Sequence, residues 1–472
     1  MIKLASASFS FCCFSTTLSP IFIIQVFTLQ NPYRRLIKLA WPIWITQAIQ
    51  TLMVTIDLVM SAQVSDADMA AVGTALSIWH PVFFFALGCM MVLAPLLSRS
   101  YGSSNNKAFQ HDLNQSLWFA LLVAIIFTVC LFAAMPLLSL LSLDKPLVEI
   151  GQQYLTYLAL GIPFICFIGA FRYLNESLGQ TKPLMYISIF GLLCNIPLNY
   201  LFIYGSAITP KMGGAGCGIA TTIVNIIVLV SLYIFSKYSR HTQQFAKNLR
   251  FEKIEIATQL KLIRLGCPIG LTLFLEIALF AAVALAIATH GTNAAAAHQI
   301  ALNVVTNFYM IPLSIGMAAT VLIGQSIGKN DQYSAKSWVK YTLIVSIAFS
   351  VLSTTTIILF RSVFASMFEP SQQVFQLAIA LLVWAGIFQL PDVIQTSFSS
   401  CLRGYADTQV PFVLVLVSYW LLGFPLGMIL SETNWIIPQQ GPEGYWQGLL
   451  IGLSCTSILL YLRLKRVWNH QI

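Results

Sequence analysis

The chain has 472 residues, of which 58% are hydrophobic and only 9% are charged. A soluble domain averages about 25% charged residues, so this composition excludes a soluble globular protein and indicates a polytopic membrane protein. The formal net charge of +9 does not predict a nucleic-acid partner, because the Lys and Arg residues lie in the gaps between apolar runs.

The first 33 residues are apolar and Ser-rich, and Lys3 is their only charge. Beyond Arg35 the chain goes straight into another apolar span, whereas a secretory signal precedes a hydrophilic mature protein. We therefore expect residues 1–33 to be a dispensable N-terminal extension.

Twelve apolar runs follow, and each is long enough to cross a bilayer, because about 20 apolar residues in a helix span the hydrocarbon core. The pattern predicts an all-α membrane protein with twelve transmembrane helices. The runs are residues 36–62, 74–98, 113–141, 150–176, 183–205, 213–236, 262–289, 294–327, 337–360, 372–402, 408–431 and 444–464.

A polar linker at residues 237–261 separates two six-span halves, residues 34–236 and 262–472. Residues 36–43 (LIKLAWPI) match residues 262–269 (LIRLGCPI) at an offset of 226, and the offset shifts by only two residues near the ends of the halves. Similarity at a fixed offset indicates duplication. Since six is an even number of spans, the halves are expected to be parallel repeats that form two lobes, with a transport site between or within them.

The basic residues predict the orientation of the chain in the membrane. With the N-terminus inside, all but four of the 25 Lys and Arg residues fall in inner segments. The exceptions are Lys145, Lys211 and Arg361 in outer loops, and Arg172 inside a span. An excess of Lys and Arg remains cytoplasmic, so we expect both termini and the linker to be cytoplasmic.

Three carboxylates lie well inside the spans: Asp57, Glu276 and Asp392. A charge at the bilayer centre costs roughly 2.5 to 3.5 kcal/mol on insertion scales, so such residues face a protein interior or a wet cavity and are functional candidates. The structural alternative is pairing with a base, and only Arg172 is available inside a span. Unpaired acids can instead bind a proton or, with neighbouring oxygens, a hard cation such as Na⁺.

Polar and aromatic side chains accompany these acids. Asn195 and Asn199 are four residues apart around Pro197, so their amides share one helix face and can supply oxygen ligands or simply hydrogen-bond neighbouring helices. Trp384 and Phe388 lie on the same run as Asp392 and can offer ring faces to a cation.

Nucleotide-binding and metalloprotease motifs do not occur in the sequence. The string GQSIGK at residues 324–329 lacks the spacing of a phosphate-binding loop, and H-E-x-x-H is absent. We therefore expect a secondary transporter without a cofactor, which draws its energy from an ion gradient or from the gradient of its own substrate.

Residues 31–466 resemble the multidrug and toxic compound extrusion (MATE) transporters, specifically the bacterial NorM-like branch. The resemblance rests on VTIDLVMSAQVSDADMAAVG around Asp57, NIPLNYLFIYG from Asn195, FLEIALFAAVAL around Glu276, and CLRGYADTQVP at residues 401–411. It implies a two-lobed, twelve-helix antiporter of the bacterial inner membrane that expels organic cations in exchange for Na⁺ or H⁺.

The resemblance also assigns the family's acids to Asp57, Glu276 and Asp392, and makes Asp57 with Asn195 and Asn199 its amino-lobe cation site. It implies that Glu276 with Asp392 forms a second candidate Na⁺ site, in the carboxy-terminal lobe. One departure is Phe388, where some relatives carry a tyrosine four residues before the acid, which removes an oxygen from that second site.

Our hypothesis is that two kinds of cation compete for these sites. A lipophilic cation binds near ionised Glu276 and Asp392, and it is released when a proton or Na⁺ binds to these acids or to Asp57. We expect a monomer in the lipid bilayer whose partners are small organic cations. Three alternatives remain: a flippase for lipid-linked saccharides, which favours a cationic cavity for phosphates; an integral membrane enzyme; and a channel.

Overall fold

The computed structural model describes residues 32–140, 144–206 and 209–470. The expectation for the N-terminal extension therefore lies outside the described residues, except at Pro32 and Tyr33. Within the described part, twelve helices are long and apolar enough to cross a membrane. The predicted all-helical membrane fold is confirmed.

The amino-terminal lobe contains six of these spans, and two of them are interrupted. Its helices are α2 (Pro32–Ala62), α3 (Asp66–Met90) continued by α4 (Leu93–Gly102), α5 (Asn106–Ala134) continued by α6 (Leu137–Leu140), α7 (Lys145–Ser177), α8 (Lys182–Tyr204) and α9 (Ala215–Tyr238).

The carboxy-terminal lobe contains the other six spans. Its helices are α11 (Ile256–Ala288), α12 (Thr292–Gly328), α13 (Gln332–Leu359) continued by α14 (Arg361–Ser366), α15 (Gln372–Gly404), α16 (Gln409–Leu416) joined through the π-helix η1 (Val417–Gly423) to α17 (Phe424–Glu432), and α18 (Pro442–His470).

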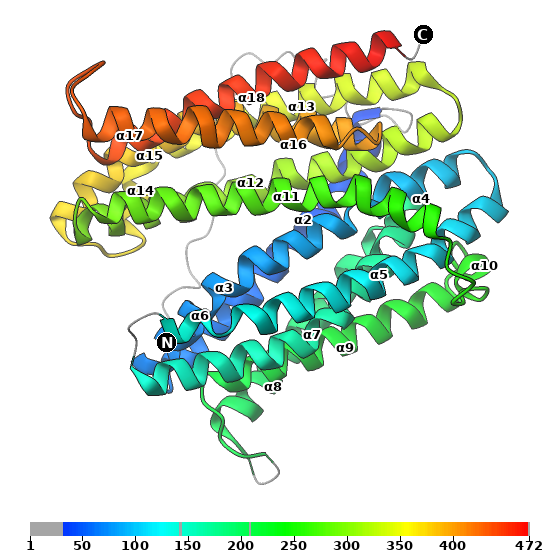
Figure 1. The fold of residues 1–472 in the computed structure, drawn as a ribbon, viewed down its shortest axis with the longest axis horizontal. Coiled ribbons are helices and arrows are strands. Elements are labelled where there is room, and N and C mark those ends of the chain that lie inside the picture. The colour runs from blue at the N-terminus through cyan, green and yellow to red at the C-terminus, as the bar shows by residue number, and fades with distance from the viewer. Residues whose placement is uncertain (1–31, 141–143, 207–208, 471–472) are drawn as a thin grey trace, which may run out of the picture.

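The two lobes approach each other at one end of the molecule and separate at the other. In Figure 1 the lobes lie one below the other and meet near α4, whereas α6 and α17 lie apart at the opposite end. Between the lobes, α12 packs against α2 and α4, and α3 packs against α11. We call the two ends of the molecule the α4 end and the α17 end.

Glycines allow the lobes to pack closely at the α4 end. A methyl group on Gly102 would collide with the backbone carbonyl of Gln325, and one on Gly328 would collide with the carbonyl of Arg99. At the repeat offset of 226 residues, Gln325 is the equivalent of Arg99, and Gly328 is the equivalent of Gly102. The contact of Gly102 with Gln325 is therefore equivalent to the contact of Gly328 with Arg99. Such reciprocal contacts are the mark of a two-fold axis, here a pseudo-two-fold axis between the repeats.

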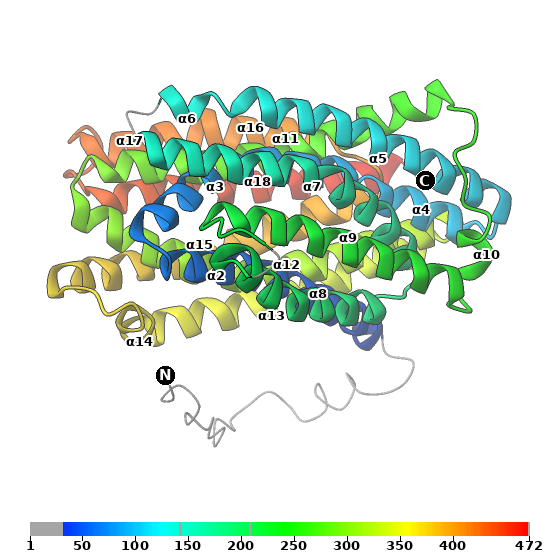
Figure 2. The same cartoon turned by 90° about the horizontal axis from the view of Figure 1, so that it is seen from below.

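The linker between the lobes is shorter than residues 237–261, because α9 continues to Tyr238 and α11 begins at Ile256. It contains the short helix α10 (Gln243–Ala246) and lies at the α4 end in both views (Figure 2). Its extended part is bound to α5, where Trp118 Nε1 donates to the carbonyl of Glu252 at 2.7 Å.

Candidate functional site

Asp57 lies at the centre of a polar cluster inside the amino-terminal lobe. The amide of Asn199 donates to Asp57 Oδ1 at 2.6 Å, and that of Asn195 donates to the same oxygen at 3.4 Å. The hydroxyl of Thr221 on α9 donates to Asp57 Oδ2 at 3.0 Å. Asp57 is only 3% exposed, so donors from two helices, α8 and α9, surround a buried carboxylate of α2.

The spacing of Asn195 and Asn199 explains how α8 presents both amides to α2. Residues four apart lie on one helix face, and Asn199 also donates to Asn195 Oδ1 at 3.0 Å. In this arrangement both amides donate to Asp57. Binding of Na⁺ would require the amide oxygens to turn inward, and Asn199 Oδ1 has no partner among the described residues, so it is free to accept a ligand.

Glu276 and Asp392 form a second acidic cluster, inside the carboxy-terminal lobe. The two carboxylates are close enough to repel each other electrostatically. Gln395 Nε2 donates to Glu276 Oε1 at 3.2 Å, and Thr396 in turn donates to Gln395 Oε1 at 3.2 Å. Asp392 is 8% exposed and has no hydrogen-bond partner in the described part of the chain.

Two tyrosines complete this second cluster. Tyr309 on α12 and Tyr419 in η1 both interact electrostatically with Glu276 and Asp392. Their hydroxyls provide oxygen near the acids, although Phe388 itself has none. Neither tyrosine was predicted from the sequence, because nothing in a single sequence indicates which residues of α12 and η1 face α11 and α15.

One of the two aromatic candidates, Phe388, does not offer an open ring face in this conformation. Phe388 is fully buried and packs against Phe280 and Trp446 at ring-centroid distances of 6.0 and 5.6 Å. Trp384 is half-buried, and its indole Nε1 donates to Glu443 at 2.8 Å. Phe388 therefore lies in the core of the lobe and not on a cavity wall.

None of the three acids forms an ion pair with a base within the described residues. Arg172 is instead bound to Glu176, its neighbour four residues later on α7, with Nε and Oε1 2.7 Å apart. Glu176 is a further buried acid, 1% exposed, that was not predicted from the sequence.

Arg403 lies one residue beyond the predicted span 372–402, but α15 continues to Gly404. Arg403 lies in the last turn of α15, is only 9% exposed, and its guanidinium interacts electrostatically with Glu276. Arg403 forms no ion pair within the described residues and donates to the hydroxyl of Ser400. The amino-lobe and carboxy-lobe clusters share no member in the described part of the chain.

A family model described as MatE matches residues 42–201 and 268–429, and these two segments begin 226 residues apart, which is the offset of the repeat.

Two curated relatives cover nearly the whole chain. A protein of Mannheimia succiniciproducens called "Probable multidrug resistance protein NorM" is 36% identical over 93% of this chain and 94% of its own length. "Multidrug resistance protein NorM" of Vibrio vulnificus (strain YJ016) is 35% identical over 92% of this chain and 95% of its own.

Solved structures share the fold at low sequence identity. The chain superposes on the eukaryotic MATE transporter AtDTX14 with a TM-score of 0.83 at 17% identity, covering 95% of this chain and 98% of that one. It superposes on a MATE transporter in a bent conformation with a TM-score of 0.84 at 18% identity, covering 97% and 99%. These likenesses establish the two-lobed architecture.

Proposed function

Because the chain belongs to the MatE family, we propose that it is a multidrug efflux antiporter of the bacterial inner membrane, which exports lipophilic organic cations in exchange for Na⁺ or H⁺. The drug transporters of this family are secondary transporters rather than enzymes. Residues 324–328 (GQSIG) do have the spacing of a nucleophile elbow, but Ser326 lies inside α12 and donates to the carbonyl of Leu322. A nucleophile elbow requires a sharp turn between a strand and a helix.

One observation supports the coupling mechanism most directly: each lobe buries a carboxylate cluster that has no ion-paired base among the described residues. A carboxylate kept in a membrane interior without a counter-ion has a strong affinity for a small cation, either a proton or Na⁺. The same negative charge attracts a lipophilic cation. Both ligands can therefore compete for these sites.

The distribution of basic residues supports placing the α4 end in the cytoplasm. The linker lies at this end and carries Lys247, Arg250 and Lys253, and an excess of such residues remains on the inner side. Because the lobes are in contact at the α4 end, the conformation described here is outward-facing in this proposal.

Transport then proceeds by rocking of one lobe against the other. A drug cation enters from the inside near ionised Glu276 and Asp392, and the lobes rearrange so that it faces outward. A proton or Na⁺ then occupies these acids or Asp57, cancels the attraction and releases the drug. The ion can shift the balance only through its different affinities for the two states. A flippase for lipid-linked saccharides is less well supported, because both buried clusters are acidic.

Efflux of ethidium from vesicles that contain the purified protein tests this proposal. We expect ethidium to leave against its gradient when either a Na⁺ gradient or a pH gradient is applied alone, and the effective gradient identifies the coupling ion. Vesicles with a Glu276→Gln, Asp392→Asn double variant serve as the control. Equal ethidium movement in the two preparations under both gradients would contradict cation-coupled export.

A further inference from the structure

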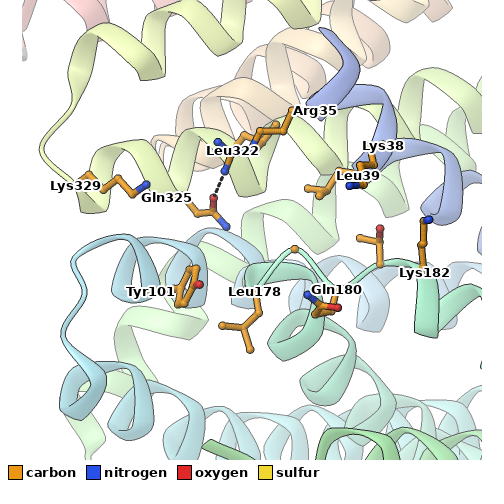
Figure 3. A pocket seen from close by; sticks show the side chains of 12 residues that line it. Arg35, Lys38, Leu39, Tyr101, Leu178, Gln180, Lys182, Leu322, Gln325 and Lys329 are labelled. Carbon is orange, nitrogen blue, oxygen red and sulfur yellow. Dashed lines mark hydrogen bonds between the residues drawn. The ribbon is translucent and has the colours of Figure 1, made fainter. Parts of the chain in front are cut away.

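A basic pocket at the α4 end is distinct from both acidic clusters. It has a volume of about 540 Å³ and lies between the lobes. Its cationic side chains are Arg35 and Lys38 of α2, Lys182 at the start of α8, and Lys329 at the end of α12. Figure 3 shows Lys329 on one side of the opening and Lys182 on the other.

The start of α8 adds partial positive charge to this pocket, although Pro183 at its second position has no N–H to donate. Thr181 and Lys182 line it, and the 23-residue helix begins at Lys182. The first N–H groups of a helix have no partner within the helix, and the helix dipole places partial positive charge there. A helix start beside several cations is a favourable environment for a phosphate group.

No carboxylate belongs to the lining of the pocket, and none of its four cations forms an ion pair within the described residues. Arg35 donates to Gln325 Oε1 at 3.2 Å, and its guanidinium lies 5.5 Å from the centre of the Trp338 ring. Asp331 interacts electrostatically with Lys329 but uses its carboxylate to cap α13. The positive charge of the pocket is therefore not balanced by the protein.

We propose that this pocket binds a phosphate-bearing anion, with Arg35, Lys38, Lys182 and Lys329 as its charged contacts. Arginine and lysine side chains bind phosphate oxygens through charge-assisted hydrogen bonds. The anion is either the headgroup of an anionic phospholipid, because the pocket opens at an end of the helices, or free phosphate.

Binding at this place bridges the two lobes. Arg35, Lys38 and Lys182 belong to the amino-terminal lobe, whereas Lys329 belongs to the carboxy-terminal lobe. An anion that contacts both lobes binds more tightly when they are closed at the α4 end, so it favours this conformation over one that is open there. This consequence rests on the alternating-access part of the proposed function, but binding itself does not.

Thermal unfolding of the detergent-solubilised protein tests the binding. Potassium phosphate is compared with potassium chloride at equal ionic strength, so that no Na⁺ is present. We expect phosphate to raise the unfolding temperature by about 2 to 4 °C. The Lys182→Gln, Lys329→Gln double variant is expected to weaken phosphate binding at least about tenfold. Both side chains are exposed, so the variant should fold.

Lys340→Gln is the matched control, because this exposed lysine lies on α13 near the same end but outside the pocket. It should keep the full response to phosphate. An equal response of the wild type and the double variant would overturn the proposal, since it would show a general effect of surface charge.

Short-chain phosphatidylglycerol and short-chain phosphatidylcholine distinguish the two sources of the anion. If phosphatidylglycerol raises the unfolding temperature at lower concentration than inorganic phosphate, the occupant is a lipid headgroup; if only inorganic phosphate acts, it is the free anion. If neither acts more strongly on the wild type than on the double variant, there is no such site.

Hydrogen exchange then tests the effect on the lobes without a transport assay. Saturating anion should slow amide exchange in α4 and in the last turns of α12 in the wild type, and not in the double variant. If the anion bound without slowing amide exchange in α4 and α12, the pocket would still be an anion site, but the claim that the anion bridges the lobes would be refuted. Absence of ethidium efflux from vesicles with the wild type, by contrast, would contradict the proposed function but not the proposal that the pocket binds an anion.

Discussion

Glu276 is the carboxylate at which charge and shape can be separated most cleanly. It is half-buried, receives one hydrogen bond from Gln395 and lies close to Asp392. Glu276→Gln removes the charge and keeps the shape, so we expect coupled efflux of ethidium to fall by at least about tenfold. Glu276→Asp keeps the charge and should retain most of the activity. Ethidium efflux from vesicles under the effective gradient measures both.

A control for the Glu276 variants is Glu149→Gln, which removes an exposed carboxylate at the start of α7. It should transport like the wild type. Full activity of Glu276→Gln would contradict the assignment of this residue to the coupling site.

The buried ion pair of Arg172 with Glu176 has a structural role. The guanidinium also donates to Gln47 on α2 at 3.2 Å and contacts the sulfur of Met317 in the other lobe. Glu176→Gln leaves an uncompensated buried charge, which costs roughly 3 to 5 kcal/mol. Replacing both partners by Met should recover most of that loss. The unfolding temperature of the solubilised variants measures the effect, and a double variant as unstable as Glu176→Gln would argue against it.

The sequence predicted the amino-lobe cluster better than its surroundings. The spacing of Asn195 and Asn199 placed two amides on one face, and the structure directs that face at Asp57. Thr221 could not be predicted, because a single threonine in an apolar helix carries no signal of its direction. Glu176 was overlooked since it lies near the end of an apolar run, where an acid is expected to reach water.

At the scale of elements, hydropathy located all twelve spans but not their interruptions. The break between α3 and α4 follows from Pro95, whose missing N–H and ring prevent a helical hydrogen bond to Met91. Ala94 instead donates to the carbonyl of Met91 three residues back. The π-helix η1 has no comparable signal. It lies where Gly423 approaches Gly452 of α18, a contact that depends on the whole lobe.

The attachment of the linker to α5 depends on Gln115. Its side chain donates to the carbonyl of Lys253 at 3.0 Å and accepts from the amide of Glu255 at 3.1 Å. Loss of two hydrogen bonds at about 1 kcal/mol each raises the detached fraction roughly tenfold or more. We therefore expect trypsin to cleave the linker of the Gln115→Leu variant about tenfold faster than that of the wild type, after Lys247, Arg250 or Lys253.

Gln152→Leu is the control for this prediction, because Gln152 bonds Ser139 away from the linker. Unchanged cleavage of the Gln115→Leu variant would show that the linker is held by other contacts.

The pKa of Glu255 in the linker is below its usual range because the hydroxyl of Thr258 and then His111 bind its carboxylate. The stabilisation that these bonds give through the ionised carboxylate is complete at neutral pH and is lost only as the pH falls through the lowered pKa. The cleavage assay should therefore be run near pH 7.

At the scale of the whole molecule, the duplication explains why closure is concentrated at the α4 end. The reciprocal contacts of Gly102 with Gln325 and of Gly328 with Arg99 relate the two lobes about one pseudo-two-fold axis. The sequence revealed the repeat, but not which end of it is closed. In the proposed alternating-access mechanism, that choice depends on the small energy difference between two packings of the same helices, which no local pattern encodes.

Gly328→Ala tests whether closure at this end is needed for transport. Gly328 is the last residue of α12 and does not have a positive φ, so alanine suits its backbone and should slightly favour the helix. The nearest atoms that the added methyl group would meet are the carbonyl of Arg99 and the backbone N of Ser103 in the other lobe. We expect faster amide exchange in α4 and a loss of ethidium efflux, with the unfolding temperature nearly unchanged.

Gly73→Ala separates this steric effect from a general effect of replacing glycine in a membrane helix. Gly73 lies inside α3, and a methyl group there would meet nothing within 4 Å, so exchange and efflux should match the wild type. If Gly328→Ala also matched the wild type in both measurements, contact between α4 and α12 could not be the closed gate. If both variants lost activity alike, helix flexibility rather than contact between the lobes would limit transport.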